Sequence, residues 1–243
     1  MRQIIAMGGG GFSMEPDNLA LDQYILDQSS KPRPKVCFVP TASGDADAYL
    51  LNAYKAFSKL DCRISHLSLF RPPLGDLESY VMDKDVIYVG GGNTRNLLVL
   101  WREWGLDVIF RKAYEAGVVL AGISAGANCW FDVCTTDSVP GQLRALPCLG
   151  LLKGSFSPHY DGEAERRPTL HQLMREGKIA PGWGSDNSSA LHFVDEQPLR
   201  AVCSKPEAKV YRVELDGGEV VETALEMMDL TAKPPKSDVE VLT

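Results

Sequence analysis

The chain has 243 residues, a formal net charge of −7 at pH 7, and 44% hydrophobic and 23% charged residues. These fractions are typical of a globular protein and exclude a collagen-like chain, a coiled coil or a largely disordered chain. Because Lys and Arg are scattered along the sequence, it lacks the basic patch of a nucleic-acid-binding protein. No apolar run approaches the ~18 residues that cross a bilayer, and the apolar start is too short for a signal peptide. We therefore expect a cytoplasmic protein that binds neither nucleic acid nor a membrane.

The cysteines and glycines give no sign of a metal or a cofactor. The 6 cysteines and 4 histidines show neither a CxxC pair nor metal-ligand spacing. Several cysteines lie in apolar runs, which is typical of small buried thiols in a reducing compartment. The quartet Gly8 to Gly11 lacks the spacing of a dinucleotide-binding loop. We therefore expect no metal and no cofactor.

Short β-branched runs alternate with amphipathic helical segments through the first two thirds of the chain. This alternation predicts a parallel sheet with helices on both of its faces. The longest helical segment is expected to break near Gly105. Expected strands are Gln3 to Met7, Lys35 to Val39, Arg63 to Leu69, Asp85 to Val89 and Val118 to Ile123, and expected helices are Asn18 to Leu26, Ala46 to Leu60 and Asn96 to Ala116.

After Gly150 the pattern changes to a strand, a polar helix and then strand pairs. The turn Asp216-Gly217-Gly218 is typical of a hairpin. The predicted fold is therefore α/β, a three-layer, doubly wound and mostly parallel sheet with antiparallel edge hairpins. No linker separates two domains, so we expect one α/β domain over residues 1–232 and a C-terminal tail over 233–243. The later strands are expected at Leu151 to Phe156, Ala190 to Val194, Leu199 to Ser204, Val210 to Leu215 and Glu219 to Thr223.

The clearest catalytic signal is Gly122-Ile123-Ser124-Ala125-Gly126, which lies between an expected strand and an expected helix. A GxSxG motif in that position is typical of a nucleophile elbow, in which the flanking glycines allow a cramped turn that exposes the serine hydroxyl. The start of the helix places the Ala125 N–H where it can stabilise an oxyanion. Ser124 is therefore the candidate nucleophile.

A serine nucleophile needs an adjacent base, which is usually a histidine. His66 and His192 lie within expected strands and His171 on an amphipathic helix, so packed or solvated roles are expected for these three. His159 instead follows a strand end, where the loops of a parallel sheet meet at one edge. His159 is therefore the candidate base.

The group that orients the histidine is expected to be a carboxylate. Asp186 lies in a glycine-rich loop after a short strand and is the preferred candidate, and Asp161, two residues from His159, is the alternative. The order serine, histidine, acid differs from that of the α/β-hydrolases and argues against an esterase or lipase.

A second glycine cluster, Gly90-Gly91-Gly92, follows another expected strand and precedes a helix. It lacks both the GxGxxG spacing and the lysine of a phosphate-binding loop. A bare backbone beside the elbow can supply a second oxyanion donor, and Gly92 is the candidate. Asn93 or Thr94 is expected to cap the following helix.

The segments VGGGNT at 89–94, GISAGA at 122–127, TTDSVP at 135–140 and SPHY at 157–160 together resemble the peptidase E family. That family comprises α-aspartyl dipeptidases, with the cyanophycinases as more distant relatives. The resemblance covers roughly the whole chain in order and spacing. It implies a fold like that of the class I glutamine amidotransferases, with a serine in place of the cysteine nucleophile.

The resemblance also implies roles for particular residues. It maps the nucleophile to Ser124, the base to His159, the oxyanion donors to Gly92 and Ala125, and the acid to Asp186, where peptidase E has a glutamate. We expect substrate contacts from Asn93, Asp137 and Arg166. Asp137 matches an acidic residue that binds the substrate ammonium or supports its loop. Recognition of an N-terminal aspartate requires a cation, and Arg166 and Arg167 both follow His159.

The sequence therefore predicts a serine exopeptidase of dipeptidase type that hydrolyses short peptides, including those with an N-terminal aspartate. One alternative is a cyanophycinase-like hydrolase of β-aspartyl-arginine peptides, which needs an acidic pocket for the arginine. Another is a non-catalytic, amidotransferase-like binding module. The expected partner is a short peptide substrate, and the sequence leaves open whether the protein forms a homo-oligomer.

Overall fold

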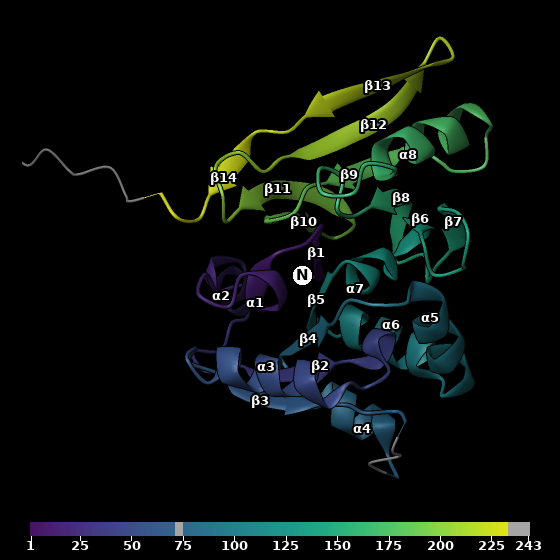
Figure 1. Cartoon of the computed structure of the whole chain (residues 1–243). Helices are drawn as coiled ribbons and strands as arrows, with labels where there is room; N and C mark the ends of the chain where they lie inside the picture. Colours follow the sequence, from purple (N-terminus) through teal and green to yellow (C-terminus); the bar gives the residue numbers. More distant parts are fainter. Residues whose placement is uncertain (71–74, 233–243) are drawn as a thin grey trace, which may run out of the picture.

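The computed structural model describes residues 1–70 and 75–232, and its strands form two sheets (Figure 1). The predicted tail over 233–243 lies outside the described residues. The main sheet has eight strands in the order β14-β11-β10-β1-β5-β4-β2-β3. These strands are β1 (Gln3–Met7), β2 (Lys35–Val39), β3 (Arg63–His66), β4 (Val86–Val89), β5 (Val119–Ile123), β10 (Ser189–Val194), β11 (Gln197–Cys203) and β14 (Met227–Asp229).

The main sheet is parallel over five of its strands and mixed at one edge, as predicted. Strands β1, β5, β4, β2 and β3 run parallel to one another, whereas β10 pairs antiparallel with both β1 and β11. Because β1 and β5 are parallel neighbours, the chain segments that follow Met7 and Ile123 leave the sheet side by side. This edge carries the candidate site.

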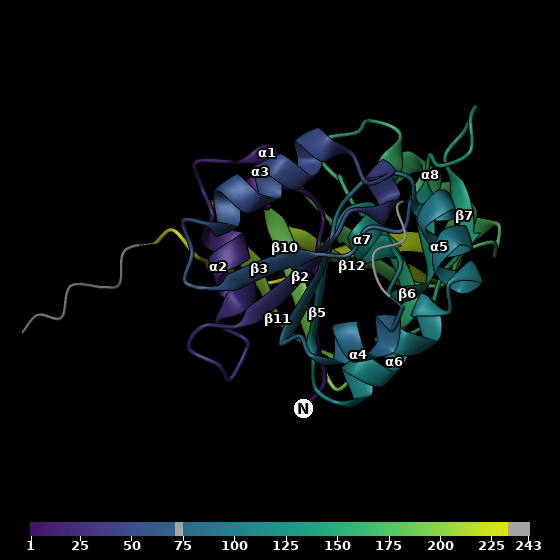
Figure 2. The same ribbon diagram turned by 90° about the horizontal axis from the view of Figure 1, so that it is seen from below.

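Helices cover both faces of the main sheet, which confirms the predicted α/β class (Figure 2). The alternate residues Ile5 and Met7 of β1 pack in the apolar cluster that includes α1 to α3, and Ile4 and Ala6 pack in the cluster that includes α4 to α6. The predicted break at Gly105 is confirmed, because Gly105 has a φ of 68° between α5 and α6. No helix within residues 1–70 and 75–232 is long and apolar enough to cross a membrane. The helices are α1 (Gly11–Met14), α2 (Ala20–Leu26), the 3-10 helix η1 (Thr41–Ser43), α3 (Asp47–Phe57), α4 (Leu77–Met82), α5 (Thr94–Glu103), α6 (Leu106–Glu115), α7 (Ala125–Asn128) and α8 (Arg166–Arg175).

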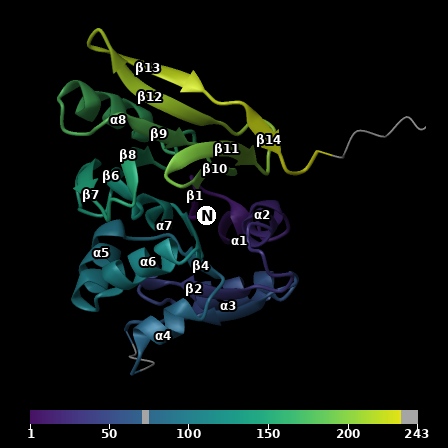
Figure 3. The same ribbon diagram turned by 180° about the vertical axis from the view of Figure 1, so that it is seen from behind.

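The second sheet has six strands in the order β13-β12-β9-β8-β6-β7, and the sequence did not predict it. The predicted hairpins are both present, but they divide between the sheets: β10 and β11 extend the main sheet, and β12 and β13 extend the second. Helix α8 covers the outer face of the second sheet through Leu170 and Met174. Helix α7 lies where the two sheets meet (Figure 3). The strands are β6 (Phe131–Thr136), β7 (Arg144–Pro147), β8 (Leu152–Ser157), β9 (Gly182–Ser185), β12 (Val210–Asp216) and β13 (Glu219–Ala224).

A buried carboxylate fixes the turn that follows β1. Asp22 of α2 is fully buried, and its carboxylate accepts hydrogen bonds from the Phe12 N–H at 2.8 Å and the Tyr88 hydroxyl at 3.1 Å. Burial raises the pKa of Asp22 to about 7, which the two hydrogen bonds only partly offset. This carboxylate holds the segment that begins at Gly8, which packs against the candidate site.

We predict that Asp22→Asn removes a pH-dependent loss of stability. The pKa of Asp22 is higher in the folded protein than in the unfolded chain, so the unfolded state releases this proton first as the pH rises from about 4 to about 7. The free energy of unfolding then falls by up to about 1.4 kcal/mol per pH unit over that range. Relative to the wild type, the asparagine variant should gain roughly 3 kcal/mol between pH 5 and pH 8 in urea unfolding. If the variant and the wild type differ in unfolding free energy by the same amount at pH 5 and at pH 8, the prediction is contradicted.

Candidate active site

Ser124 lies at a strained turn between β5 and α7. Its backbone has a φ of 56° and a ψ of −113°, and its N–H donates to the Met7 carbonyl at 3.0 Å. The flanking glycines are required by space: a Cβ on Gly122 would lie 2.1 Å from the Gly126 carbonyl oxygen, and one on Gly126 would lie 2.3 Å from that of Val89. This geometry is typical of a nucleophile elbow.

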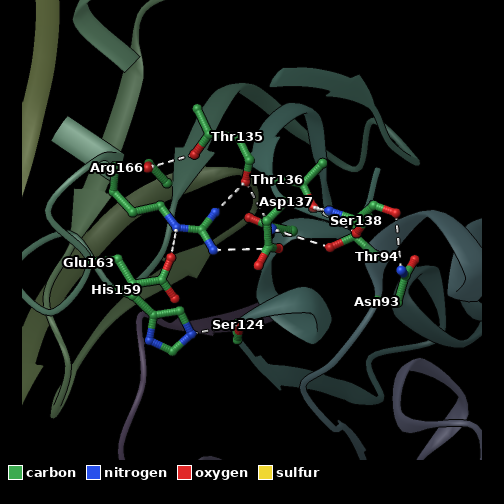
Figure 4. Close-up of polar contacts among 12 residues, drawn as sticks. Asn93, Thr94, Ser124, Thr135, Thr136, Asp137, Ser138, His159, Glu163 and Arg166 are labelled. Atoms are coloured by element: carbon green, nitrogen blue, oxygen red, sulfur yellow. Dashed lines mark hydrogen bonds and ion pairs between the residues drawn. The ribbon is translucent and has the colours of Figure 1, made fainter. Parts of the chain in front are cut away.

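His159 follows β8 and faces Ser124. Its Nε2 lies 2.8 Å from the Ser124 Oγ (Figure 4). The His159 backbone has a φ of 52°, and its N–H donates to the Gly8 carbonyl at 3.1 Å. A positive φ is uncommon for a residue with a side chain and indicates a position that its surroundings determine. The structure therefore brings together the predicted nucleophile and the predicted base, although they are 35 residues apart in sequence.

The other imidazole nitrogen contacts an amide and not the predicted carboxylate. His159 Nδ1 lies 2.7 Å from Oδ1 of Asn187. An amide oxygen can only accept a hydrogen bond, so Nδ1 carries the proton and donates it. The Nε2 lone pair is then free to accept the Ser124 hydroxyl proton. Asn187 therefore sets the tautomer that a general base requires.

Asp186 lies one residue away but does not contact His159, so the structure corrects the prediction that it orients the imidazole. Its Oδ2 accepts the Lys209 N–H at 3.0 Å, and its buried Oδ1 has no partner among the described residues. Burial raises the pKa of Asp186 to about 6. Asp186 follows the end of β9, and Asn187 begins the turn toward β10, so the two neighbouring side chains leave the backbone in different directions.

The alternative acid, Asp161, also does not contact the imidazole. Its Oδ1 accepts the backbone N–H of Asn187 at 2.8 Å. Asp161 therefore acts on the position of Asn187. The contacts form a continuous series from Asp161 through Asn187 and His159 to Ser124, with heavy-atom distances between 2.7 and 2.8 Å.

Two glycines leave the space that the Asn187 side chain occupies. A Cβ on Gly9 would lie 2.0 Å from the Asn187 Oδ1 and 3.0 Å from the His159 Nδ1, and a Cβ on Gly162 would lie 2.2 Å from the Asn187 Nδ2. These distances are far shorter than van der Waals contact, so only glycine fits. The glycine quartet Gly8 to Gly11, for which the sequence predicted no role, therefore lines the site beside Asn187 and His159. This run of glycines was the sequence feature that could have located this side of the site.

The glycine loop after β4 lies beside the nucleophile. A Cβ on Gly91 would lie 3.4 Å from the Ser124 Cβ, and the Gly91 N–H donates to the Tyr49 hydroxyl at 3.2 Å. Gly92 has a φ of 135°, and a Cβ there would lie 2.3 Å from the Ala42 carbonyl oxygen. Within residues 1–70 and 75–232, neither the Gly92 N–H nor the Ala125 N–H donates a hydrogen bond. Both predicted oxyanion donors are therefore available to a ligand.

Asn93 is engaged within the protein at both ends of its amide. Its Oδ1 accepts the Asn96 N–H at 2.9 Å, which confirms the predicted helix cap, and its Nδ2 donates to the Ser138 carbonyl at 3.1 Å (Figure 4). Asn93 therefore ties the start of α5 to the loop that carries Asp137. These contacts favour a structural role over the substrate contact expected from the sequence.

Arg166 is a buried cation whose partners are already in place. Its side chain is only 4% exposed, and Nε donates to Glu163 Oε2 at 2.6 Å. Its Nη1 donates to the Thr135 carbonyl at 3.1 Å, and its Nη2 lies 3.7 Å from Asp137 Oδ1. The Asp137 side chain is 70% exposed. One guanidinium and two carboxylates therefore meet beside His159 and Ser124, as Figure 4 shows, with more negative than positive charge.

Arg167, the other arginine that the sequence offered, turns away from this group. Its guanidinium lies over the rings of Tyr160 and Tyr211, at 4.6 and 4.8 Å from their centroids. Its Nε lies 3.4 Å from a Glu222 carboxylate oxygen on β13. These contacts join α8 to the outer hairpin, so Arg167 stabilises the second sheet.

Comparisons with known proteins identify relatives similar in sequence and in fold. Residues 4–200 match the model of Peptidase family S51. The chain is 60% identical over 225 residues to a protein called uncharacterized peptidase YgaJ of Bacillus subtilis (strain 168), a match that covers 93% of this chain and 97% of the relative. It is 30% identical over 167 residues to Peptidase E of Shewanella amazonensis, covering 64% and 69% of the two chains.

A solved structure of a peptidase from an acI-B1 Actinobacterium has the same fold. Its TM-score is 0.63 at 18% sequence identity, and the match covers 92% of this chain and 97% of that one. The chain therefore belongs to peptidase family S51, and it is a peptidase. The predicted resemblance to peptidase E is confirmed.

We predict that Gly9→Ala inactivates the site without unfolding the protein. The added methyl group would overlap the Asn187 Oδ1 and press on the His159 Nδ1, so the imidazole must move away from Ser124. Peptidase activity should fall by ~10²-fold, which is the effect of an error of about 1 Å in catalytic geometry. Gly75→Ala is the matched control, because a Cβ at Gly75 meets no atom of the described residues within 4 Å. Full activity of the Gly9 variant, with folding confirmed by circular dichroism, would contradict the prediction.

Proposed function

We propose that the protein is a serine exopeptidase of dipeptidase type that hydrolyses short peptides through an acyl-enzyme. The observation that carries the proposal is the 2.8 Å contact between Ser124 Oγ and His159 Nε2 at a strand-to-helix turn. Ser124 is the nucleophile, His159 is the base, and Asn187 orients the base. This arrangement corresponds to the serine, histidine and acid of other hydrolases, with an amide in the third position.

The chemistry follows from these positions. Ser124 Oγ attacks the carbonyl carbon of the scissile peptide bond while its proton passes to His159 Nε2. The negative oxygen that forms is stabilised by the N–H groups of Gly92 and Ala125. His159 then gives its proton to the leaving amine as the C–N bond breaks. A water molecule then attacks the acyl ester while His159 takes its proton, the C–O bond to Ser124 breaks, and His159 returns the proton to Ser124 Oγ as the acid product leaves.

The charges near Ser124 favour recognition of a cationic group on the substrate. The guanidinium of Arg166 is buried and paired with Glu163, so a substrate carboxylate would have to compete with a partner at 2.6 Å. Asp137 is exposed and has only a distant ion-pair contact at 3.7 Å, so its carboxylate can accept a hydrogen bond from a free α-amino group. We therefore propose that Asp137 binds the substrate amino terminus and that an N-terminal aspartate is not required.

The two carboxylates beside Arg166, those of Glu163 and Asp137, also favour a second candidate function. Glu163 and Asp137 could accept the guanidinium of a β-aspartyl-arginine peptide, as a cyanophycinase-like hydrolase requires. The contact between Ser124 and His159 weighs against a non-catalytic binding module. All six cysteines are free, and five of them are buried, which supports a reducing, cytoplasmic location.

We predict that a fluorophosphonate probe labels Ser124 and that labelling depends on Asn187 more than on Asp186. Ser124→Ala should abolish labelling. Asn187→Ala removes the contact that fixes the imidazole and should slow labelling by ~10²-fold. Asp186→Asn is the matched control, because it changes a charge that does not contact His159, and it should slow labelling by less than about tenfold.

The measurement is the second-order rate of probe incorporation, with the modified residue identified by mass spectrometry. Labelling that persists in Ser124→Ala would overturn serine catalysis. If Asp186→Asn is the severely impaired variant and Asn187→Ala reacts normally, the assignment of the third residue is wrong while the nucleophile stands.

We predict that a free amino terminus matters more than an N-terminal aspartate. Dipeptides with a free amine should be cleaved, and N-acetylated forms should lose activity because Asp137 then has no cation to bind. Asp137→Asn should raise KM for free-amine substrates by about 3- to 5-fold with little change in kcat, since it removes one exposed charge contact of about 0.5–1 kcal/mol. Steady-state kinetics on a panel of dipeptides with neutral, acidic and basic first residues tests this.

Strict dependence on a first-position aspartate would contradict the proposed role of Asp137. Cleavage of β-aspartyl-arginine alone would support the second candidate function. If internally cleaved, end-blocked proteins are better substrates than any dipeptide, the exopeptidase proposal is wrong.

A further inference from the structure

Two cysteines on adjacent strands of the second sheet lie in contact. Cys134 is on β6, and Cys148 follows the last residue of β7, which pairs antiparallel with β6. Their Sγ atoms are 3.5 Å apart. Cys134 is buried, whereas Cys148 is partly exposed. One thiol of the pair is therefore accessible to a small oxidant and the other is in position to react with the product.

We propose that Cys134 and Cys148 form a redox-sensitive pair that closes a disulfide when the protein meets a peroxide. The Cys148 thiol reacts first with hydrogen peroxide and gives a sulfenic acid and one water molecule. The Cys134 thiol then attacks the Cys148 sulfur, forms the S–S bond and releases a second water. Two thiols are oxidised and one peroxide is reduced to two water molecules.

The geometry requires only a small movement. A disulfide has a sulfur–sulfur distance of ~2.05 Å, so the two Sγ atoms must approach by about 1.5 Å. The Cys148 Sγ makes one other hydrogen bond among the described residues, with the Leu146 carbonyl at 3.4 Å. Burial shields Cys134 from solvent and raises the pKa of its thiol, which disfavours the reactive thiolate. The expected order, with the partly exposed Cys148 oxidised first, follows from the difference in burial between the two cysteines.

Cys134 lies close in sequence to Asp137, the residue that we propose binds the substrate amino terminus. Cys134 precedes Thr135, whose carbonyl oxygen accepts a hydrogen bond from Arg166 Nη1 at 3.1 Å. Asp137 lies two residues after Thr135, and the Ser138 carbonyl accepts a hydrogen bond from Asn93 Nδ2. The catalytic contacts of Ser124, His159 and Asn187 come from other segments. Closing the disulfide should therefore change KM for short peptides more than kcat, and this second consequence rests on the proposed function.

The test exposes the full-length protein to millimolar hydrogen peroxide under native conditions and maps its peptides by mass spectrometry without reduction. The expected product is a Cys134–Cys148 linked peptide with a mass loss of about 2 Da, reversed by dithiothreitol. C148S should not form it. C203S is the matched control, because it removes a buried thiol elsewhere in the protein and should leave the linked peptide unchanged. C148S also avoids the buried position, where a substitution is more disruptive.

Oxidation of Cys148 to sulfinic acid without the linked peptide would overturn the proposal, and so would a link from Cys148 to another cysteine. Kinetics of the linked protein, before and after reduction, test the coupling to the site. A several-fold change in KM that is absent in C148S supports it. A linked protein with unchanged kinetics would overturn the coupling but not the cross-link, and neither result depends on whether Ser124 is the nucleophile.

Discussion

The amide of Asn187 lies between the backbones of Gly9 and Gly162, and the position of the His159 imidazole depends on that close packing. A single methyl group on either glycine would lie within 2.2 Å of an Asn187 side-chain atom. The segments that meet there follow β1, β8 and β9, and so come from both sheets. Main-chain hydrogen bonds hold them together, from His159 to Gly8 and from Ser188 to Gly9. The site therefore exists because three chain segments approach one another without side chains between them.

Much of this arrangement could be predicted from the sequence, because it depends on local patterns. The strand ends and the GxSxG turn placed Ser124, and the position of His159 after a strand separated it from the three other histidines. The third residue could not be predicted in the same way. Asp186 and Asn187 are neighbours, and which of them faces His159 depends on where β9 ends and on the space left by Gly9. A preference for carboxylates in that role favoured the wrong neighbour.

The second sheet was missed for a related reason. Alternation of apolar residues shows that a segment is extended and which side is buried, but not which strand it pairs with. The hairpin around Gly217 was predicted correctly, yet β12 pairs with β9 and not with an edge strand of the main sheet. The sequence likewise could not show which charged residues are already paired within the protein and which are free to contact a substrate. Only the structure shows that Glu163 already pairs with Arg166 and that Arg167 lies against tyrosine rings.

An amide in place of a carboxylate has an electrostatic consequence in the proposed mechanism. Asn187 fixes the tautomer of His159 but brings no negative charge to stabilise the imidazolium that forms as Ser124 attacks. Two carboxylates near Asn187 lie one step further from the imidazole: Asp161, which accepts the Asn187 N–H, and Asp186, the preceding residue. Burial, together with the nearby charge of Asp161, makes the ionised form of Asp186 costly, and the Lys209 N–H and Arg167 only partly offset this, so its pKa is raised to about 6. A positive charge on His159 lowers that cost. The attraction between the Asp186 carboxylate and a positively charged His159 is therefore more favourable near the transition state than in the resting enzyme. This is the condition under which a charge assists catalysis without touching the reacting atoms.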